Sequence, residues 1–262
     1  MRLEIACRSR NDFQKLVEEF GGQTEKLSRN WLKRFTDREQ SKPLKIGKRL
    51  VISAKDDSKI TTAAGKPPLL IIPRGTAFGT GEHATTAMSL RLLEQLTRKW
   101  KNGWSLADLG TGSGVLVLAA KRFGARRVLA IDVDPIAIST AKANARRNGI
   151  DGVDFQLGDV RRWNSARWMD IMTANLFNEL LIQILPKLKR SSWLILSGIL
   201  RAQEKEFLRA LRRHKIDLVQ VRRRGKWIAV LANVAHASRP RRRTEANATL
   251  NLREQRPPVR FF

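Results

Sequence analysis

The sequence is short of residues that carry several common chemistries. Its one cysteine, Cys7, allows no internal disulfide, and three scattered histidines with that cysteine give no ligand spacing for a metal ion. No apolar run approaches the roughly 20 residues that span a bilayer, and the charged residues among the first ten leave no signal-peptide core. We therefore expect a cytoplasmic, reduced protein with no metal and no membrane contact.

Acidic residues are also scarce. Asp and Glu number 24 against 51 Lys and Arg, which gives a formal net charge of +27 at pH 7. Such a charge favours polyanions such as RNA through counterion release, but a solvated basic surface would have the same composition. The charge therefore allows two interpretations, a weak contact with ribosomal RNA or the ribosome through a basic surface, and no contact at all.

The chain divides into three regions of different composition. Hydrophobic residues make up 42% of the 262 positions, which supports one full domain with a small appendage. Two short helix-like stretches, 13–20 and 31–35, and an extended piece, 45–52, come first. The last region carries Arg and Pro without an apolar period, so we expect a disordered basic tail. The expected regions are 1–62, a reduced N-terminal substrate or linker region, 63–234, the main domain, and 235–262, the tail.

Strands and helices alternate through the main domain. A strand at 69–72 and a helix at 85–99 lead into it. The expected strands are 105–110, 127–133, 153–157, 169–174, 192–197, 218–222 and 227–232, and the expected helices are 113–123, 135–147, 176–188 and 201–214. This order predicts an α/β, Rossmann-like fold with a parallel sheet covered on both faces. The short Arg/Gly turn before residue 227 predicts a hairpin, and so one antiparallel strand at the edge of a mostly parallel seven-stranded sheet.

A glycine-rich loop follows the first strand of this alternation. Its glycines let the backbone turn sharply and approach a ligand closely. The dinucleotide fingerprint needs Gly or Ala at the position that Val115 holds here, so nicotinamide binding is disfavoured. The candidate ligand-binding residues of the loop are Asp108, Gly110, Gly112 and Gly114.

Two acidic residues follow the next strands. Asp132 ends the second strand, 22 residues after Gly110, where a carboxylate can accept hydrogen bonds from both ribose hydroxyls; the alternative is an exposed strand-end carboxylate. Asp134 is expected to cap the following helix, with Pro135 in its first turn. Asp159, after the third strand, could meet an adenine amino group or could serve only as a turn residue.

Several motifs resemble one known family. The G-x-G-x-G loop is similar to the first motif of class I methyltransferases. Residues 73–86, PRGTAFGTGEHATT, resemble the FGTGxHxTT signature of the PrmA family, the methyltransferases of ribosomal protein L-eleven. Residues 173–176 (TANL) and 197–200 (SGIL) resemble two further segments of that family. The likeness covers about residues 28–234; the FGTGxHxTT segment is specific to the family, and the glycine loop only to the superfamily.

The resemblance implies S-adenosylmethionine as cofactor and several residues as its contacts. They are Thr86, Gly110, Asp132 and Asn175, with Phe78, Gly79, Thr80 and Gly81 forming a wall of the site. Taken without the family, Phe78 is equally well a core phenylalanine. His83 could donate a hydrogen bond on the ligand side, as a catalytic residue, or could hold the loop in place.

The reaction that the resemblance implies is N-methylation of lysine or amino groups of a ribosomal protein, with L-eleven as the first candidate. In this reading the catalytic Asn175 presents a carbonyl oxygen to the amine hydrogens. About 30 residues precede the linker-like segment 31–35. This stretch of about 30 residues is shorter than the family's recognition domain. Two alternatives remain. One is an RNA or small-molecule N-methyltransferase, although residues 175–178 lack the Pro-Pro-aromatic pattern of base-amine enzymes. The other is a ribosome-binding module without catalysis.

Overall fold

The computed structural model describes four stretches of the chain, 43–55, 67–73, 83–164 and 167–234, together with the single residues Gln14, Val17, Glu18 and Gly21. The chain divides into two compact units, Met1–Ser41 and Lys42–Phe262. The stretch expected as a helix at 31–35, most of the one at 13–20, and the basic tail lie outside the described residues. None of the described helices has the length and apolarity to cross a bilayer.

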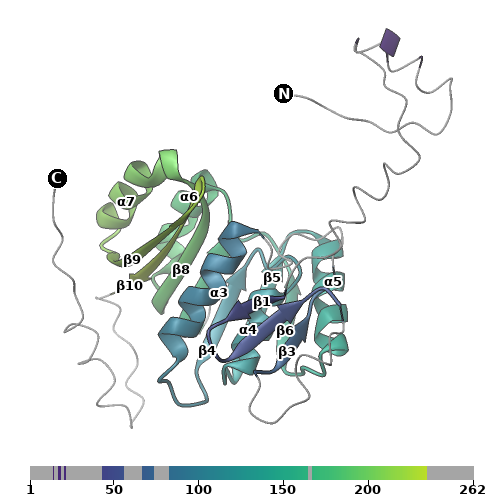
Figure 1. Ribbon diagram of the computed structural model, residues 1–262. Coiled ribbons are helices and arrows are strands. Elements are labelled where there is room, and N and C mark those ends of the chain that lie inside the picture. Colours follow the sequence, from purple (N-terminus) through teal and green to yellow (C-terminus); the bar gives the residue numbers. More distant parts are fainter. Residues whose placement is uncertain are drawn as a thin grey trace. The chain divides into compact units, whose positions relative to one another are not determined.

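A seven-stranded sheet forms the centre of the second unit (Figure 1). Its order is β6-β5-β4-β7-β8-β10-β9, and every pairing is parallel except those of β10, which runs antiparallel to both neighbours. The strands are β4 (Ser105–Leu109), β5 (Arg127–Asp132), β6 (Val153–Leu157), β7 (Met169–Asn175), β8 (Ser191–Leu200), β9 (Asp217–Arg224) and β10 (Trp227–Asn233). The predicted mostly parallel sheet is confirmed, with the antiparallel strand one position inside the edge.

Helices cover both faces of this sheet. One face packs against α3 (Ala84–Thr97), α4 (Val115–Arg122) and α5 (Pro135–Arg147), and the other against α6 (Asn178–Leu188) and α7 (Glu204–Arg213), which follows the short helix η3 (Arg201–Gln203). Successive side chains of a strand point to opposite faces. On β4, Leu106 therefore joins the α3 and α4 core, whereas Ala107 joins the α6 and α7 core.

A small second sheet precedes α3. It consists of β1 (Leu44–Ile46), β2 (Leu50–Ser53) and β3 (Leu69–Ile71), with β1 antiparallel and β3 parallel to β2. The expectation of one continuous extended piece at 45–52 is wrong, because Gly47 turns the chain there with a φ of 54°. Only glycine adopts such an angle readily, so this residue makes a hairpin of the segment.

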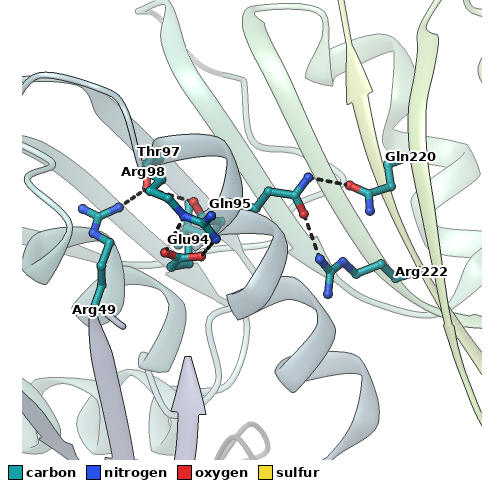
Figure 2. Close-up of polar contacts among 8 residues, drawn as sticks. Arg49, Glu94, Gln95, Thr97, Arg98, Gln220 and Arg222 are labelled. Carbon is teal, nitrogen blue, oxygen red and sulfur yellow. Dashed lines mark hydrogen bonds and ion pairs between the residues drawn. The ribbon is translucent and has the colours of Figure 1, made fainter. Parts of the chain in front are cut away.

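Helix α3 is buried on more than the one face that its apolar period predicts. That face, Met88, Leu92, Leu93 and Leu96, lies in the core as expected, but Leu90 and Glu94 are buried too. The carboxylate of Glu94 accepts hydrogen bonds from Arg98 Nε (3.1 Å) and Nη2 (2.8 Å) (Figure 2). Arg49, after β1, donates to Thr97 Oγ1 at 3.2 Å. The Arg49–Thr97 hydrogen bond thus joins the small sheet to α3, whereas the Glu94–Arg98 ion pair lies within the helix and its C-cap.

Candidate active site

The glycine loop is pinned to the neighbouring strand by backbone hydrogen bonds. The amides of Gly110 and Thr111 both donate to the carbonyl of Ile131, at 2.8 and 2.9 Å. Gly110 has a φ of 78°, and a Cβ atom there would lie 2.5 Å from Leu176 Cδ2. A side chain at position 110 would therefore be strained and would collide with the residue that follows β7. The loop is held in a conformation that brings backbone close to the carboxyl ends of β4 and β7.

Asp108 is a buried carboxylate directly beneath this loop. Its side chain is 1% exposed, and Thr173 Oγ1 on β7 donates to its Oδ1 at 2.5 Å. Its Oδ2 has no hydrogen-bond partner among the described residues. Burial raises the pKa of Asp108 to about 7, against the opposing effects of the nearby Thr173 and Thr111 hydroxyls. A buried carboxylate with an unused acceptor atom suits a cationic ligand group, because such a group would repay the cost of burial.

Asp132 links the loop to a cavity. Its Oδ2 accepts a hydrogen bond from the Gly112 amide at 2.8 Å, and its Oδ1 accepts one from the Asp134 amide at 3.1 Å. Each oxygen keeps a second lone pair, so the carboxylate can still accept hydroxyl hydrogens. Asp132 lines a cavity of about 370 Å³ at the carboxyl ends of β4, β5, β6 and β7, a volume typical of a small-molecule site.

Asp159 reaches the same cavity from the end of β6. Its Oδ1 accepts from the Arg161 backbone amide at 2.8 Å, which makes a tight side-chain turn. The Arg161 guanidinium also bonds both carboxylate oxygens, which lowers the pKa of Asp159. Asp159 is thus the turn residue that one interpretation of the sequence predicted. Because Asp159 also lines the cavity, the other interpretation, a contact with an adenine amino group, stays a prediction.

Thr86 and Asn175, far apart in sequence, are neighbours in the fold. Asn175 Nδ2 on β7 donates to Thr86 Oγ1 in the first turn of α3 at 3.3 Å. Asn175 is partly exposed and Thr86 is buried. With Nδ2 engaged by Thr86, the amide oxygen Oδ1 is the side-chain atom that can serve a substrate. Asn175 ends β7, directly before Leu176, which lines the cavity.

His83 immediately precedes α3. Its Nδ1 lies 2.7 Å from Thr85 Oγ1, and its ring makes an edge-to-face contact with Trp227, with the ring centroids 5.2 Å apart. Burial lowers the pKa of His83, and the charge of Lys226 lowers it further. These contacts hold the imidazole between α3 and β10 and keep it neutral near pH 7. Of the other residues of that motif, Phe78, Gly79, Thr80 and Gly81 lie outside the described residues.

The first turns of α6 complete the site, and the sequence did not single them out. The cavity is lined there by Leu176, Glu179, Leu180 and Gln183. Phe177, between the last strand residue and the helix, is 75% exposed, an unusual state for a large aromatic ring. The sequence could have indicated these residues by their position directly after β7. The strand order of the sheet reverses between β4 and β7, and ligands of open α/β sheets bind at such a point.

Close packing against β8 fixes the position of the segment around Leu176. Gly198 on β8 has a φ of 92°, and a Cβ atom there would lie 2.2 Å from the carbonyl oxygen of Leu176. The Leu176 amide donates to the Ser197 carbonyl at 3.0 Å. The segment that carries Asn175 is therefore placed by backbone contact with β8. Within the described ranges, no group of three His, Cys, Asp or Glu side chains could hold a metal ion.

The sheet order, the pinned glycine loop and the acidic residue at the end of β5 define a class I methyltransferase fold. The family model described as ribosomal protein L11 methyltransferase (PrmA) matches residues 7–234, and the chain belongs to that family. The resemblance read from the sequence is thereby confirmed.

Individual relatives agree with the family assignment. The ribosomal protein L11 methyltransferase of Symbiobacterium thermophilum is 37% identical over 195 residues, 73% of this chain and 62% of that protein. The one from Pelotomaculum thermopropionicum is 35% identical over 198 residues, 74% of this chain and 62% of that protein. The chain thus spans about three-fifths of the length of these relatives. A crystal structure of the ribosomal protein L11 methylase of Lactobacillus delbrueckii subsp. bulgaricus superposes with a TM-score of 0.64 at 27% identity, over 73% of this chain and 97% of that one.

Proposed function

We propose that the chain is an S-adenosylmethionine-dependent protein methyltransferase that N-methylates lysine or amino groups of a ribosomal protein, with L11 as the first candidate. The observation that carries this proposal is the cavity at the carboxyl ends of four parallel strands, lined by Gly110 and Asp132 beside the Thr86–Asn175 pair. The names of the relatives support the choice of substrate. We propose the cytoplasm, where ribosomal proteins and reduced thiols occur together, as its place of action.

The residues present fit this cofactor. The carboxylate of Asp132 would hold the ribose hydroxyls, and the loop from Gly110 would pass along the ribose and the methionine part. The buried Asp108, with Oδ2 unpartnered, suits a nearby ammonium group. Asp159 and the apolar α6 residues would bound the adenine end. When bound, the cofactor supplies an electrophilic methyl group on a sulfonium.

The chain's own task is to present a neutral, correctly aimed amine. At pH 7 a lysine with the reference pKa of about 10.4 must lose a proton at a cost of roughly 4–5 kcal/mol. Apolar surroundings lower that cost by disfavouring the ammonium form; the exposed ring of Phe177, next to the cavity residue Leu176, would supply such surroundings once a substrate covers it. Asn175 Oδ1 would accept an amine hydrogen, which turns the nitrogen lone pair toward the methyl group. No side chain needs to act as an obligate base.

The parts of the chain have distinct roles in this proposal. Residues 63–234 carry out methyl transfer, and the segment 1–62 acts as a substrate or linker region. Within the segment 1–62, the hairpin of β1 and β2 pairs with β3 and packs on α3.

The proposal is tested with radiolabelled S-adenosylmethionine. Purified L11, total ribosomal protein and total RNA are each incubated with the full chain, and the products are treated with protease or with RNase. We expect label on protein, removed by protease and not by RNase, and concentrated on L11 in the mixture. The Asp132→Ala variant serves as the matched control with a weakened cofactor site. Label in RNA, or none in any sample despite cofactor binding, would replace the proposal by one of the two alternatives.

A further inference from the structure

Three arginines from distant parts of the sequence gather on one face of the catalytic unit. Arg91 lies on α3, and Arg222 and Arg224 lie on β9, an element that contacts α3 directly. Burial lowers the pKa of the Arg91 guanidinium, and the charges of Arg224 and Arg222 lower it further. The three side chains, here named the arginine cluster, therefore stand close enough to repel one another.

No carboxylate among the described residues forms an ion pair with the arginine cluster. The neighbouring Arg223 behaves differently, since it pairs with Glu204. Alternate residues of a strand face opposite sides of a sheet, so Arg223 points toward α7 while Arg222 and Arg224 point toward α3. Arg98, Arg161 and Arg223 each have an acidic partner, whereas within the described residues the repulsion among the three cluster arginines has no acid to relieve it.

Arg222 is held in place before any ligand arrives. Its Nη2 donates to Gln95 Oε1 on α3 at 2.8 Å, and Gln95 Nε2 donates to Gln220 Oε1 at 3.0 Å (Figure 2). Its Nε is buried and has no hydrogen-bond partner in the part of the chain that the structure describes. A fixed guanidinium loses less side-chain entropy on binding than a mobile one, so the Gln95 contact preorganises Arg222 for a ligand that its remaining Nη hydrogens can reach.

The arginine cluster continues toward the active site. Arg224 pairs across the hairpin with Trp227, which pairs in turn with Leu200 at the carboxyl end of β8, the end at which Asn175 stands on β7. Lys226 Nζ lies 5.5 Å from the centroid of the Trp227 ring. A strip of positive charge and one aromatic ring thus leads along α3 and β9 to the edge of the sheet where the methyl acceptor would enter.

We propose that Arg91, Arg222 and Arg224 form a docking surface for the phosphate backbone of RNA, beside the entrance to the active site. Guanidinium groups match phosphate with paired hydrogen bonds, and the net charge of +27 is of the sign that RNA requires. Charges on an edge strand also discourage aggregation, but that need explains neither the Gln95 clamp nor Arg91 on a helix. This surface would draw a protein acceptor bound to RNA toward the site.

The test measures binding of a fluorescein-labelled RNA hairpin to the full chain by anisotropy, without cofactor. The triple variant Arg91→Gln, Arg222→Gln, Arg224→Gln is compared with Arg146→Gln, Arg147→Gln, Arg212→Gln, three exposed arginines on α5 and α7 whose removal changes the net charge equally. We expect the first variant to bind on the order of 100-fold more weakly near physiological salt, and its log–log salt slope to fall by about 2–3, as loss of three phosphate contacts requires. The control should change little.

Two additions keep the outcome clear. The double variant Arg91→Gln, Arg224→Gln leaves the Arg222–Gln95 bond in place, so a loss of RNA binding in both cluster variants is not a folding defect; unfolding temperature and cofactor affinity should match wild type. Polyglutamate is the second probe. Equal losses for the two sets of variants, or equal losses for RNA and polyglutamate, would overturn the proposal. Because no methyl transfer is measured, failure here leaves the proposed methyltransferase activity untouched.

Discussion

Replacing Asp108 by Asn should stabilise the fold at alkaline pH while it weakens the cofactor site. The side chain is 1% exposed, and its pKa is raised from 3.8 to about 7, first of all by burial. A carboxyl group with a raised pKa binds its proton more tightly in the folded chain than in the unfolded one. Stability therefore falls as pH rises from about 4 to about 7, because the unfolded chain is already ionised in this range.

The size of this loss of stability follows from the difference between the ordinary pKa of 3.8 and the pKa of about 7 in the folded chain. Each pH unit in which the folded state holds one extra proton is worth about 1.4 kcal/mol, so ionisation of Asp108 costs the fold roughly 4 kcal/mol above pH 7. Asparagine keeps the shape of the side chain and an Oδ1 that can still accept from Thr173, and it has no charge to bury. Asp108→Asn should recover a large part of that cost at about pH 9, but only about a third of it at about pH 5, one pH unit into the range where the unfolded carboxyl is ionised and the folded one is not.

Urea unfolding of the wild type and the variant at these two pH values is the assay, with the cofactor dissociation constant measured alongside. We expect the gain in free energy of unfolding to be more than twice as large at about pH 9 as at about pH 5, together with weaker cofactor binding. An Asp108→Asn chain that is less stable than wild type at about pH 9 would refute the argument that burial dominates. Unchanged cofactor affinity would show that the carboxylate does not serve the ligand.

Three further changes test separate parts of the site. Asp132→Ala should weaken S-adenosylmethionine binding by about 1–3 kcal/mol in calorimetry, because two ribose hydroxyls lose a charged acceptor; an unchanged constant in a folded variant would leave Asp132 as a loop anchor only. Asn175→Ala should lower turnover more than cofactor affinity, as seen in kcat against Kd, and equal losses would reduce it to a cofactor contact. Gly198→Ala should cost at least about 2 kcal/mol in the free energy of unfolding, since its Cβ would lie 2.2 Å from a backbone oxygen, whereas Gly225→Ala, with a φ of 57° and nothing within 4 Å, is the matched control without a collision.

Local chemistry let the sequence predict much of the fold. Helix α5 begins at Pro135 and ends at Arg147, as expected, because its caps are local: Asp134 Oδ1 accepts from the Ile136 amide at 2.8 Å, and Gly149 follows with a φ of 56°. The alternation of strands with helices likewise fixed the sheet class. These features depend on neighbours within a few residues, which a single sequence displays directly.

Features that depend on distant partners were not predictable. Strand β8 runs on to Leu200 because β10 pairs with it, although its own sequence indicated a stop at residue 197. Glu94 is buried on the polar side of α3 because the small sheet and Arg98 enclose it. The unpartnered oxygen of Asp108 likewise depends on packing between β4 and β7. None of these has a signature within one stretch of sequence.

The residues of the candidate site also fall into two groups, those that local sequence predicts and those that depend on distant partners. The glycine loop and Asp132 were predictable because one supersecondary unit, β4–α4–β5, contains them both and pins them with the Gly112–Asp132 hydrogen bond. The contact between Thr86 and Asn175 joins residues 89 positions apart, so it could be anticipated only through a family resemblance. In the proposed function, cofactor binding would therefore rest mainly on a local unit, while the aim of Asn175 toward a substrate would depend on how α3 packs against β7 and β8. Changes that loosen α3, such as loss of the Arg49–Thr97 bond, should therefore impair methyl transfer before they impair cofactor binding.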